Sequence, residues 1–373
     1  MTLVCTRCGA SYPFDPRRFR CERNECGGAL RLQGAPAFAQ VNHADRSLWR
    51  YRHALPLPDA ERATPVTLGE GLTPLVAARW GDLPIHFKCE FLNPTGSFKD
   101  RGMSVLVTAL AVAGVQHVVE DSSGNAGSSL AAYAARAGLR ATVYVPAHTS
   151  PVKQAQITAY GAQVVPVPGS RMDTTRAVLR ALGPDLAYAS HIYHPLFQHG
   201  IKTLAFELWE QLGQVPDAVV LPVGHGTHLL GLVQGLTELQ AAGCLARWPR
   251  LYGVQAAGCA PLALAWEQGA ADAAPVPEGD TVAEGVRIAA PVHGSAILAA
   301  VRASGGAILA VPDEQTLAAR RRLAHQGFYV EPTSALAVAA LDRLREQLAD
   351  QTVVVVLTGS GFKSPAPGPQ ALL

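Results

Sequence analysis

Short apolar runs alternate with alanine- and leucine-rich segments from about residue 65 to the end of the chain. The apolar runs are rich in β-branched residues and are bounded by turn-forming residues, which predicts buried strands. Helices are expected after Gly127, from Gly200, from Asp313 and from Thr333. Continuous apolar strands that alternate with helices are typical of parallel sheets covered on both faces, so the pattern predicts an α/β fold. The strands are expected at residues 117–121, 141–146, 162–167, 217–223, 251–256 and 352–359.

The composition limits the classes of function. The chain has 373 residues, more than one hydrophobic core usually serves, and 49% of them are hydrophobic. The formal net charge of +2 provides no bulk attraction for nucleic acid. No apolar stretch approaches the roughly 18 residues of a membrane span, and the N-terminus lacks the pattern of a signal peptide. We therefore expect a cytoplasmic protein that binds neither nucleic acid nor membranes.

The first 35 residues carry a cysteine pattern that the rest of the chain lacks. Cys5, Cys8, Cys21 and Cys26 follow the spacing C-x2-C-x12-C-x4-C. Four thiolates in two pairs can close a tetrahedral zinc site that leaves no position open for catalysis. We expect a structural zinc ribbon in residues 1–35, with reduced thiols that bind no metal as the alternative.

Three glycine-bearing loops lie between an expected strand and an expected helix, at residues 121–129, 222–232 and 357–364. In an open α/β sheet such loops gather at the carboxyl ends of the strands, where ligands bind. Glycine lets backbone N–H groups approach an anion, and a helix N-terminus adds a favourable dipole. The loops match neither the dinucleotide pattern G-x-G-x-x-G nor the nucleotide pattern G-x-x-x-x-G-K-[ST], so the anion is expected to belong to another ligand.

The stretch "NPTGSFKDRG", residues 93–102, places Lys99 directly after an aromatic residue. A lysine has a free pKa of about 10.4, but desolvation or a nearby cation such as Arg101 lowers it. The neutral amine can then bond covalently to an aldehyde. The alternative is an exposed turn lysine, because Pro94 and Gly96 favour a turn.

The lysine motif and the three loops, in this order, closely resemble the signatures of pyridoxal-phosphate enzymes of fold type II, the tryptophan synthase β group. Within that group the chain is most similar to the threonine synthase family, through "GEGLTPL" at 69–75 and "EPTSALA" at 331–337. The resemblance covers roughly residues 45–365 and implies two open parallel-sheet α/β domains after the zinc ribbon. The expected division is a linker at 36–64, a large cofactor-binding domain at 65–103 and 198–365, a small mobile domain at 104–197, and a tail at 366–373.

The resemblance also implies residue roles toward pyridoxal 5'-phosphate. Lys99 would bond to the cofactor and later shuttle a proton, and Asn125 would hydrogen-bond the cofactor's 3-hydroxyl group. Thr358 would face the pyridine nitrogen, with Ser360 as the second candidate. The phosphate of the cofactor would be held by Gly224, His225, Gly226, Thr227 and His228, and the substrate α-carboxylate by Ser122, Ser123 and Gly124.

A hydroxyl partner does not keep the ring nitrogen protonated, which suits elimination and replacement at an amino-acid side chain. The resemblance implies a lyase that acts on a small amino acid, first as a threonine synthase that converts O-phosphohomoserine to threonine and phosphate. Threonine or serine ammonia-lyase and a cysteate synthase-like enzyme are the alternatives. A non-catalytic binding or regulatory protein is an alternative of another class, against which the intact Lys99 argues. We expect a homodimer.

One segment departs from the family pattern. A threonine synthase needs a site for the substrate phosphate, and the family carries an arginine where this chain has Phe197. An apolar ring would replace a bidentate phosphate donor, so binding of O-phosphohomoserine is expected to be weak. The nearby His191, His194 and His199 are expected to compensate in part when they are protonated.

Overall fold

A computed structural model of the chain describes residues 1–58, 63–149, 151–183 and 185–363, and the expected tail at 366–373 lies outside these residues. The chain forms two compact units. Unit 1 comprises Met1–Leu72, Asn93–Thr95 and Lys99–Thr203, and unit 2 comprises Thr73–Leu92, Gly96–Phe98 and Leu204–Leu373. Among the described residues, no helix is long and apolar enough to cross a membrane.

Unit 2, in its described part, is built on a six-stranded sheet with the order β12-β11-β10-β13-β5-β4. Neighbouring strands are parallel except at the edge, where β4 and β5 form an antiparallel pair. The strands are β4 (Leu75–Trp80), β5 (Leu83–Lys88), β10 (Ala218–Pro222), β11 (Arg250–Ala256), β12 (Ala307–Val311) and β13 (Val353–Val356). The α-helices are α6 (Thr203–Leu212), α7 (Thr227–Ala241), α8 (Pro261–Glu267), α9 (Gly294–Ala303), α10 (Asp313–His325), α11 (Pro332–Ala339) and α12 (Leu341–Leu348).

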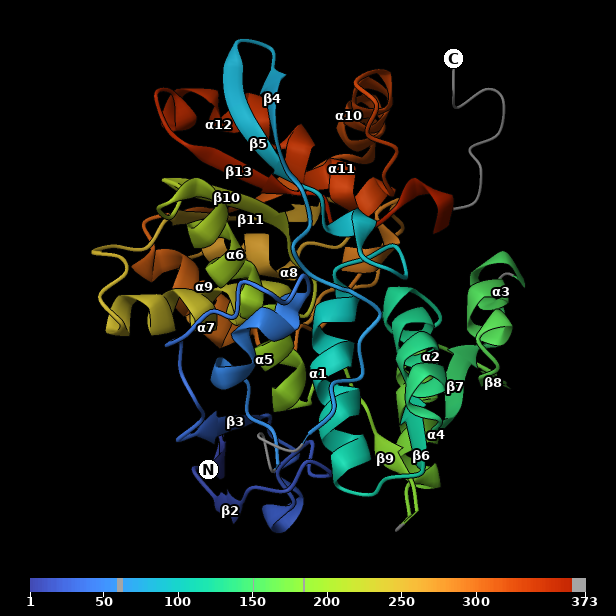
Figure 1. Ribbon diagram of the computed structural model, residues 1–373. Helices are drawn as coiled ribbons and strands as arrows, with labels where there is room; N and C mark the ends of the chain where they lie inside the picture. The colour runs from blue at the N-terminus through green and yellow to red at the C-terminus, as the bar shows by residue number, and fades with distance from the viewer. Residues whose placement is uncertain (59–62, 150, 184, 364–373) are drawn as a thin grey trace. The chain divides into compact units, whose positions relative to one another are not determined.

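The core of unit 2 follows from the unbroken apolar character of its central strands. Alternate residues such as Val220, Val254 and Val355 are buried in one cluster with Leu336 of α11. Residues between them, such as Val219, are equally buried and face the opposite way, because successive side chains of a strand alternate between the faces. Figure 1 shows α10, α11 and α12 on one face of this sheet and α6, α7 and α9 on the other. The predicted α/β class with a parallel sheet covered on both faces is confirmed.

Unit 1 contains, in its described part, a four-stranded parallel sheet with the order β8-β7-β6-β9. Ala131 of its second helix packs with Val143 on one face, and Val119 packs with Tyr188 and Val178 on the other. The strands are β6 (His117–Glu120), β7 (Arg140–Pro146), β8 (Gln163–Val167) and β9 (Ala187–Tyr188). The helices are α1 (Lys99–Val112), α2 (Asn125–Ala137), α3 (Pro151–Ala159), α4 (Arg171–Ala181) and α5 (Pro195–Ile201).

The N-terminal segment of unit 1 forms a small antiparallel sheet with the order β2-β1-β3. Its strands are β1 (Thr2–Cys5), β2 (Ser11–Pro13) and β3 (Leu30–Gln33). Arg17 donates from Nη2 to the carbonyl of Ala113 at 3.0 Å, and Phe19 packs edge-on against Tyr188. The cysteine-bearing segment is therefore packed against the rest of unit 1 by specific contacts.

Two expected helices are each divided. The helix expected from Gly200 is α5 followed by α6, with Lys202 between them, and the Thr203 hydroxyl donates to the carbonyl of Gly200 at 2.7 Å. The helix expected from Thr333 is α11 followed by α12, with Ala340 between them. The hydrophobic period continues across both breaks, so the pattern alone does not reveal them.

Glu70 is the centre of a buried hydrogen-bond network in unit 1. Its Oε1 accepts from Trp49 Nε1 at 3.0 Å and from the Ser104 hydroxyl, and its Oε2 accepts from the Tyr133 hydroxyl at 2.8 Å and from the Leu68 N–H at 2.9 Å. The Glu70 carboxylate thus joins the chain segment that precedes α1 to Ser104 of α1 and to Tyr133 of α2. A buried charge is tolerated when each of its lone pairs has a donor, as here.

We predict that Glu70→Gln destabilises the protein, because the new amide places donor hydrogens opposite Trp49 or Tyr133. Hydrogen bonds to charged groups are worth about 1.5–3 kcal/mol each, so a loss of about 3 kcal/mol in the free energy of unfolding is expected. Denaturant unfolding of Glu70→Gln and of the exposed control Glu346→Gln measures the difference. Equal stability of the two variants would contradict the role of this network.

Candidate functional site

The residues that precede Lys99 are tied to the loop after β13 within unit 2. The Phe98 N–H donates to the carbonyl of Thr358 at 3.0 Å, and the Ser360 N–H donates to the carbonyl of Gly96 at 2.9 Å. Ser97 forms a bridge with Gly359 in the same ladder. The loop expected to meet the cofactor ring and the segment that leads to the lysine therefore form one short antiparallel pair.

The side chain of Phe98 connects this pair to the loop after β10. Its ring stacks on His228 with centroids 4.0 Å apart and an interplanar angle of 10°. Two loops that the sequence predicts to bind the cofactor are thus brought together in unit 2, with Phe98 as the contact between them.

The loop after β10 has the geometry of an anion cradle. α7 begins at Thr227, its N-cap is Gly226 with φ 90°, and among the described residues no side chain caps it. A Cβ on Gly226 would lie 2.2 Å from Ile297, so only glycine fits. His228 and Thr227 are buried, while Gly224 and His225 are half-buried. Backbone N–H groups at the start of a long helix favour a phosphate, so these residues fit the phosphate of pyridoxal phosphate.

Thr358 is buried and its hydroxyl is held in place. Its Oγ1 lies 3.1 Å from Ser334 Oγ and 3.3 Å from Glu331 Oε1. Ser334 also donates to the carbonyl of Gly359 at 3.1 Å. The segment 331–337 thus orients the loop that carries Thr358 and the buried Ser360. Ser334 and Glu331 were not predicted as site residues, although both lie in the stretch "EPTSALA" at 331–337.

In unit 1, Lys99 and Asn125 are the first residues of α1 and α2, and Asp100 fixes the two helix starts together. Asp100 Oδ1 accepts from the hydroxyls of Thr95 at 2.6 Å and Ser129 at 2.7 Å. Its Oδ2 accepts from the Thr95 N–H at 2.7 Å. The turn before the lysine and the amino end of α2 therefore share one buried carboxylate.

The predicted carboxylate-binding loop follows β6 directly. Its Gly124 N–H donates to the Ser122 hydroxyl at 3.3 Å. Gly124 is exposed, and Ser122 and Ser123 are half-buried. Polar groups at the amino end of α2 are thus accessible to a small anion in unit 1.

Phe197 lies near the lysine amine. Lys99 Nζ is 5.6 Å from the centroid of the Phe197 ring, which is fully buried. The ring packs so closely on α1 that a Cβ on Gly102 would lie 2.3 Å from it. Of the residues expected at the site in unit 1, the structure therefore brings together Lys99 and Phe197.

The expectation that His194 and His199 supply positive charge is wrong. His194 is buried, its Nε2–H donates to the carbonyl of Pro16 at 2.8 Å, and burial lowers its pKa to about 4. Burial, with a smaller contribution from Lys202, also holds the pKa of His199 well below its usual range. Both side chains are neutral at neutral pH because burial disfavours the charged form.

His191 instead pairs with Glu120, a residue that was not predicted to belong to the site. His191 Nδ1 contacts Glu120 Oε1. Burial, followed by the charge of Asp121, raises the pKa of the Glu120 carboxyl well above its usual range, and the charge of Lys99 opposes the shift. An acidic residue at the end of an apolar strand is the signal in the sequence that marks it.

The four N-terminal cysteines form one cluster. The Sγ atoms of Cys5 and Cys26 are 3.7 Å apart, and those of Cys8 and Cys21 are 3.6 Å apart. Tetrahedral zinc with Zn–S bonds of about 2.3 Å separates its sulfurs by about 3.8 Å, whereas a disulfide needs about 2.05 Å. Burial raises the pKa of Cys5, but the N–H groups of Cys8 and Arg7 outweigh it and bring the pKa to about 7. The cluster fits a metal better than disulfides.

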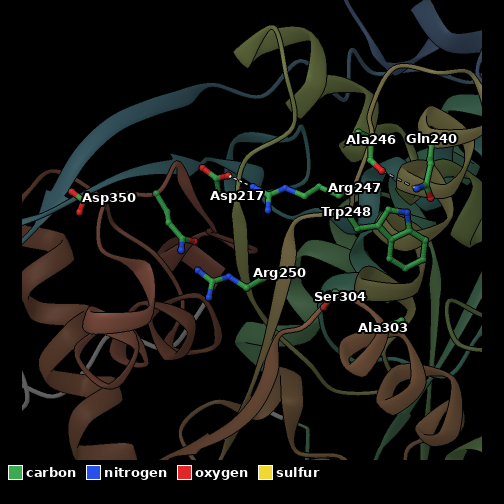
Figure 2. Close-up of a pocket in the computed structure, with 10 residues that line it drawn as sticks. Asp217, Gln240, Ala246, Arg247, Trp248, Arg250, Ala303, Ser304 and Asp350 are labelled. Carbon is green, nitrogen blue, oxygen red and sulfur yellow. Dashed lines mark hydrogen bonds and ion pairs between the residues drawn. The ribbon is translucent and has the colours of Figure 1, made fainter.

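A cavity of about 840 Å³ in unit 2 lies away from these loops. It is lined by Asp217, Arg247, Trp248 and Arg250, of which Arg247 pairs with Asp217 at 3.3 Å (Figure 2). Asp217 and Arg250 stand at the amino ends of β10 and β11. Ligands of open parallel sheets bind at the carboxyl ends, so this cavity is not the cofactor site.

Comparison with known proteins agrees with this geometry. Residues 66–359 match the family of pyridoxal-phosphate dependent enzymes. The threonine synthase of Methanocaldococcus jannaschii is 36% identical over 98% of this chain and 93% of its own. The threonine synthase of Mycobacterium bovis is 38% identical over 84% of this chain and 88% of its own.

Solved structures give the same fold. A threonine deaminase from T.th. superposes with a TM-score of 0.66 at 30% identity and covers 79% of this chain and 94% of its own. A fungal L-serine ammonia-lyase from Rhizomucor miehei superposes with a TM-score of 0.69 at 23% identity, over 78% of this chain and 94% of its own, and shows the fold alone. The chain therefore belongs to the pyridoxal-phosphate dependent enzymes, as a threonine synthase-like member of fold type II with an N-terminal cysteine cluster.

Proposed function

We propose that this lyase uses Lys99 as its cofactor-bonding residue to catalyse elimination or replacement at the side chain of a small amino acid. The observation that carries the proposal is the fixed position of Phe98 on both His228 and the Thr358 loop, because Lys99 is the next residue along the chain. The loop from Gly224 to His228 would bind the phosphate of the cofactor, and Asn125 its 3-hydroxyl group.

When bound, pyridoxal phosphate supplies an electron sink that makes the Cα–H bond of an amino acid acidic. Thr358, or Ser360 in its place, would offer the ring nitrogen a hydroxyl. Ser122, Ser123 and Gly124 would bind the α-carboxylate and so orient the Cα–H bond. The amine of Lys99 would take up the Cα proton and later return it.

The first candidate reaction is that of threonine synthase, because relatives of that name match nearly the whole chain. The second is ammonia-lyase chemistry on threonine or serine. It is favoured by Phe197, which offers no donor to a substrate phosphate, and by the similarity to a threonine deaminase. We further propose that the enzyme is a cytoplasmic homodimer.

Lys99→Ala is expected to abolish turnover and the visible absorbance of the lysine-bound cofactor, because alanine cannot form the covalent bond. Lys99→Arg is the matched variant, since it keeps the positive charge but is an unsuitable nucleophile. The spectrum and the rate of each purified protein are measured with added cofactor. Unchanged turnover in either variant would exclude Lys99 as the bonding residue.

We propose that Cys5, Cys8, Cys21 and Cys26 bind one structural zinc ion. Support comes from their sulfur atoms, which all lie within 4.8 Å of one another. Because a closed four-thiolate site has no open position, the ion would stabilise the N-terminal segment rather than act on the substrate.

Metal analysis of protein purified without chelator is expected to find about one zinc per chain. Cys8→Ser should lower that content and the melting temperature, because a ligand is lost. Cys244→Ser is the control, since Cys244 lies outside the cluster and should keep both values. A zinc content below about a tenth of an equivalent in the unchanged protein would count against the site.

Phe197→Arg is expected to strengthen binding of O-phosphohomoserine by about one to two powers of ten, the value of one charge-assisted phosphate contact. Phe197→Met is the uncharged control.

In the unchanged enzyme, a change from about pH 8 to about pH 6 should leave His194 neutral, because its pKa is about 4. His194 therefore adds no positive charge for the substrate phosphate in this range. Steady-state kinetics with O-phosphohomoserine, threonine and serine test this. A micromolar Michaelis constant for O-phosphohomoserine in the unchanged enzyme would contradict the role given to Phe197.

A further inference from the structure

His191 and Glu120 meet at the carboxyl ends of two adjacent parallel strands. Glu120 is the last residue of β6, and His191 follows the end of β9, the strand that pairs with β6. Nδ1 of His191 contacts Oε1 of Glu120. The Glu120 side chain is 0% exposed, whereas the His191 side chain is 12% exposed. The imidazole is therefore the part of the pair that a ligand can reach.

The groups around the pair differ in charge and in the direction they face. Lys99 at the start of α1 is close enough for its charge to act on Glu120. Phe197 of α5 lies edge-on to His191, with ring centroids 6.2 Å apart. Asp121 faces the other side of β6, where the Tyr188 hydroxyl donates to it at 2.8 Å. The pair thus lies on the same side of the sheet as Lys99 and the apolar ring of Phe197.

The second oxygen of Glu120, Oε2, is buried and has no hydrogen-bond partner among the described residues. A buried carboxyl in this state readily holds or shares a proton, which agrees with the raised pKa of this group. Glu120 engages Nδ1, and we assign proton exchange with a ligand to the other ring nitrogen of His191, Nε2. The surroundings disfavour a phosphate dianion, since Phe197 offers no donor and Glu120 is acidic.

On the basis of the proposed function, we propose that His191, oriented by Glu120, is a further catalytic residue that exchanges a proton with an oxygen on Cβ of the substrate. The substrate or product would then be a small amino acid with a β-hydroxyl group. This assignment serves both candidate reactions, because one forms a β-hydroxyl group and the other removes it.

In the elimination direction, the Cα proton goes to the amine of Lys99 and the Cβ–O bond breaks with its electron pair on oxygen. Nε2–H of His191 gives its proton to that oxygen, and water leaves. In the replacement direction, a lone pair of water forms the Cβ–O bond and the released proton goes to Nε2 of His191. Lys99 then returns a proton to Cα. In both directions the Glu120 carboxylate stabilises the protonated, positively charged form of His191.

Two unreactive ligands test recognition of the hydroxyl group without turnover. α-Methylserine and 2-aminoisobutyrate both lack a Cα–H bond and differ by the hydroxyl group. The cofactor-loaded enzyme is expected to bind α-methylserine about tenfold or more tightly, by titration of its absorbance or by calorimetry. His191→Ala and Glu120→Gln should remove the preference. Tyr188→Phe, which deletes a hydrogen bond on the opposite face of β6, should keep it.

Turnover of a β-hydroxy amino acid by the loaded enzyme provides the second test. His191→Ala is expected to lower kcat by about 10²–10⁴-fold with little change in KM, the usual range for a general acid or base. Added imidazole should restore part of the rate, which a structural defect would not allow. Glu120→Gln, close in shape to the native residue, should lower kcat without loss of bound cofactor.

The outcomes separate this inference from the proposed function. If the unchanged protein binds no pyridoxal phosphate at Lys99, the proposed function fails. If it binds the cofactor and turns over substrate, but neither analogue preference nor kcat depends on His191 and Glu120, the inference is overturned.

Discussion

The backbone ladder that joins Gly96 and Phe98 to Ser360 and Thr358 is the constraint on which the site depends. It holds the residues directly before α1 on the loop that follows β13, and Phe98 then extends the contact to the loop after β10. Lys99 follows Phe98 directly, so the ladder holds the chain immediately before the lysine. Such a support would give direction to the lysine that we propose to bond to the cofactor.

Several buried charged groups are matched by donors or acceptors, and Glu120 differs from them. Lys88 Nζ in unit 2 donates to Glu207 at 2.7 Å, to the carbonyl of Thr73 at 2.7 Å and to Gln211 at 2.9 Å. Glu70 and Asp100 in unit 1 likewise accept several hydrogen bonds. Glu120 keeps one buried oxygen without a partner among the described residues. A group that exchanges protons is one of the settings in which such a buried oxygen occurs.

The sequence predicted most of what depends on local pattern. The central strands are apolar throughout, so their burial on both faces followed directly, and the glycine loops were placed at the correct strand ends. The β4–β5 pair was not predicted, because β4 is largely exposed or half-buried and the apolar residues of β5 are interrupted by Pro84 and His86. The contact of His191 with Glu120 spans 71 residues and has no local signature. Likewise, only the packed structure shows that His194 is buried and neutral, since three neighbouring histidines look equivalent in a sequence.

The most direct measurement of the central claim is the location of the covalent bond to the cofactor. The protein loaded with pyridoxal phosphate is treated with borohydride, digested and mapped by mass spectrometry. We predict that the added mass of the reduced cofactor lies on Lys99, in the peptide that contains "SFK". The added mass on another lysine, such as Lys202 or Lys363, or on none, would contradict it.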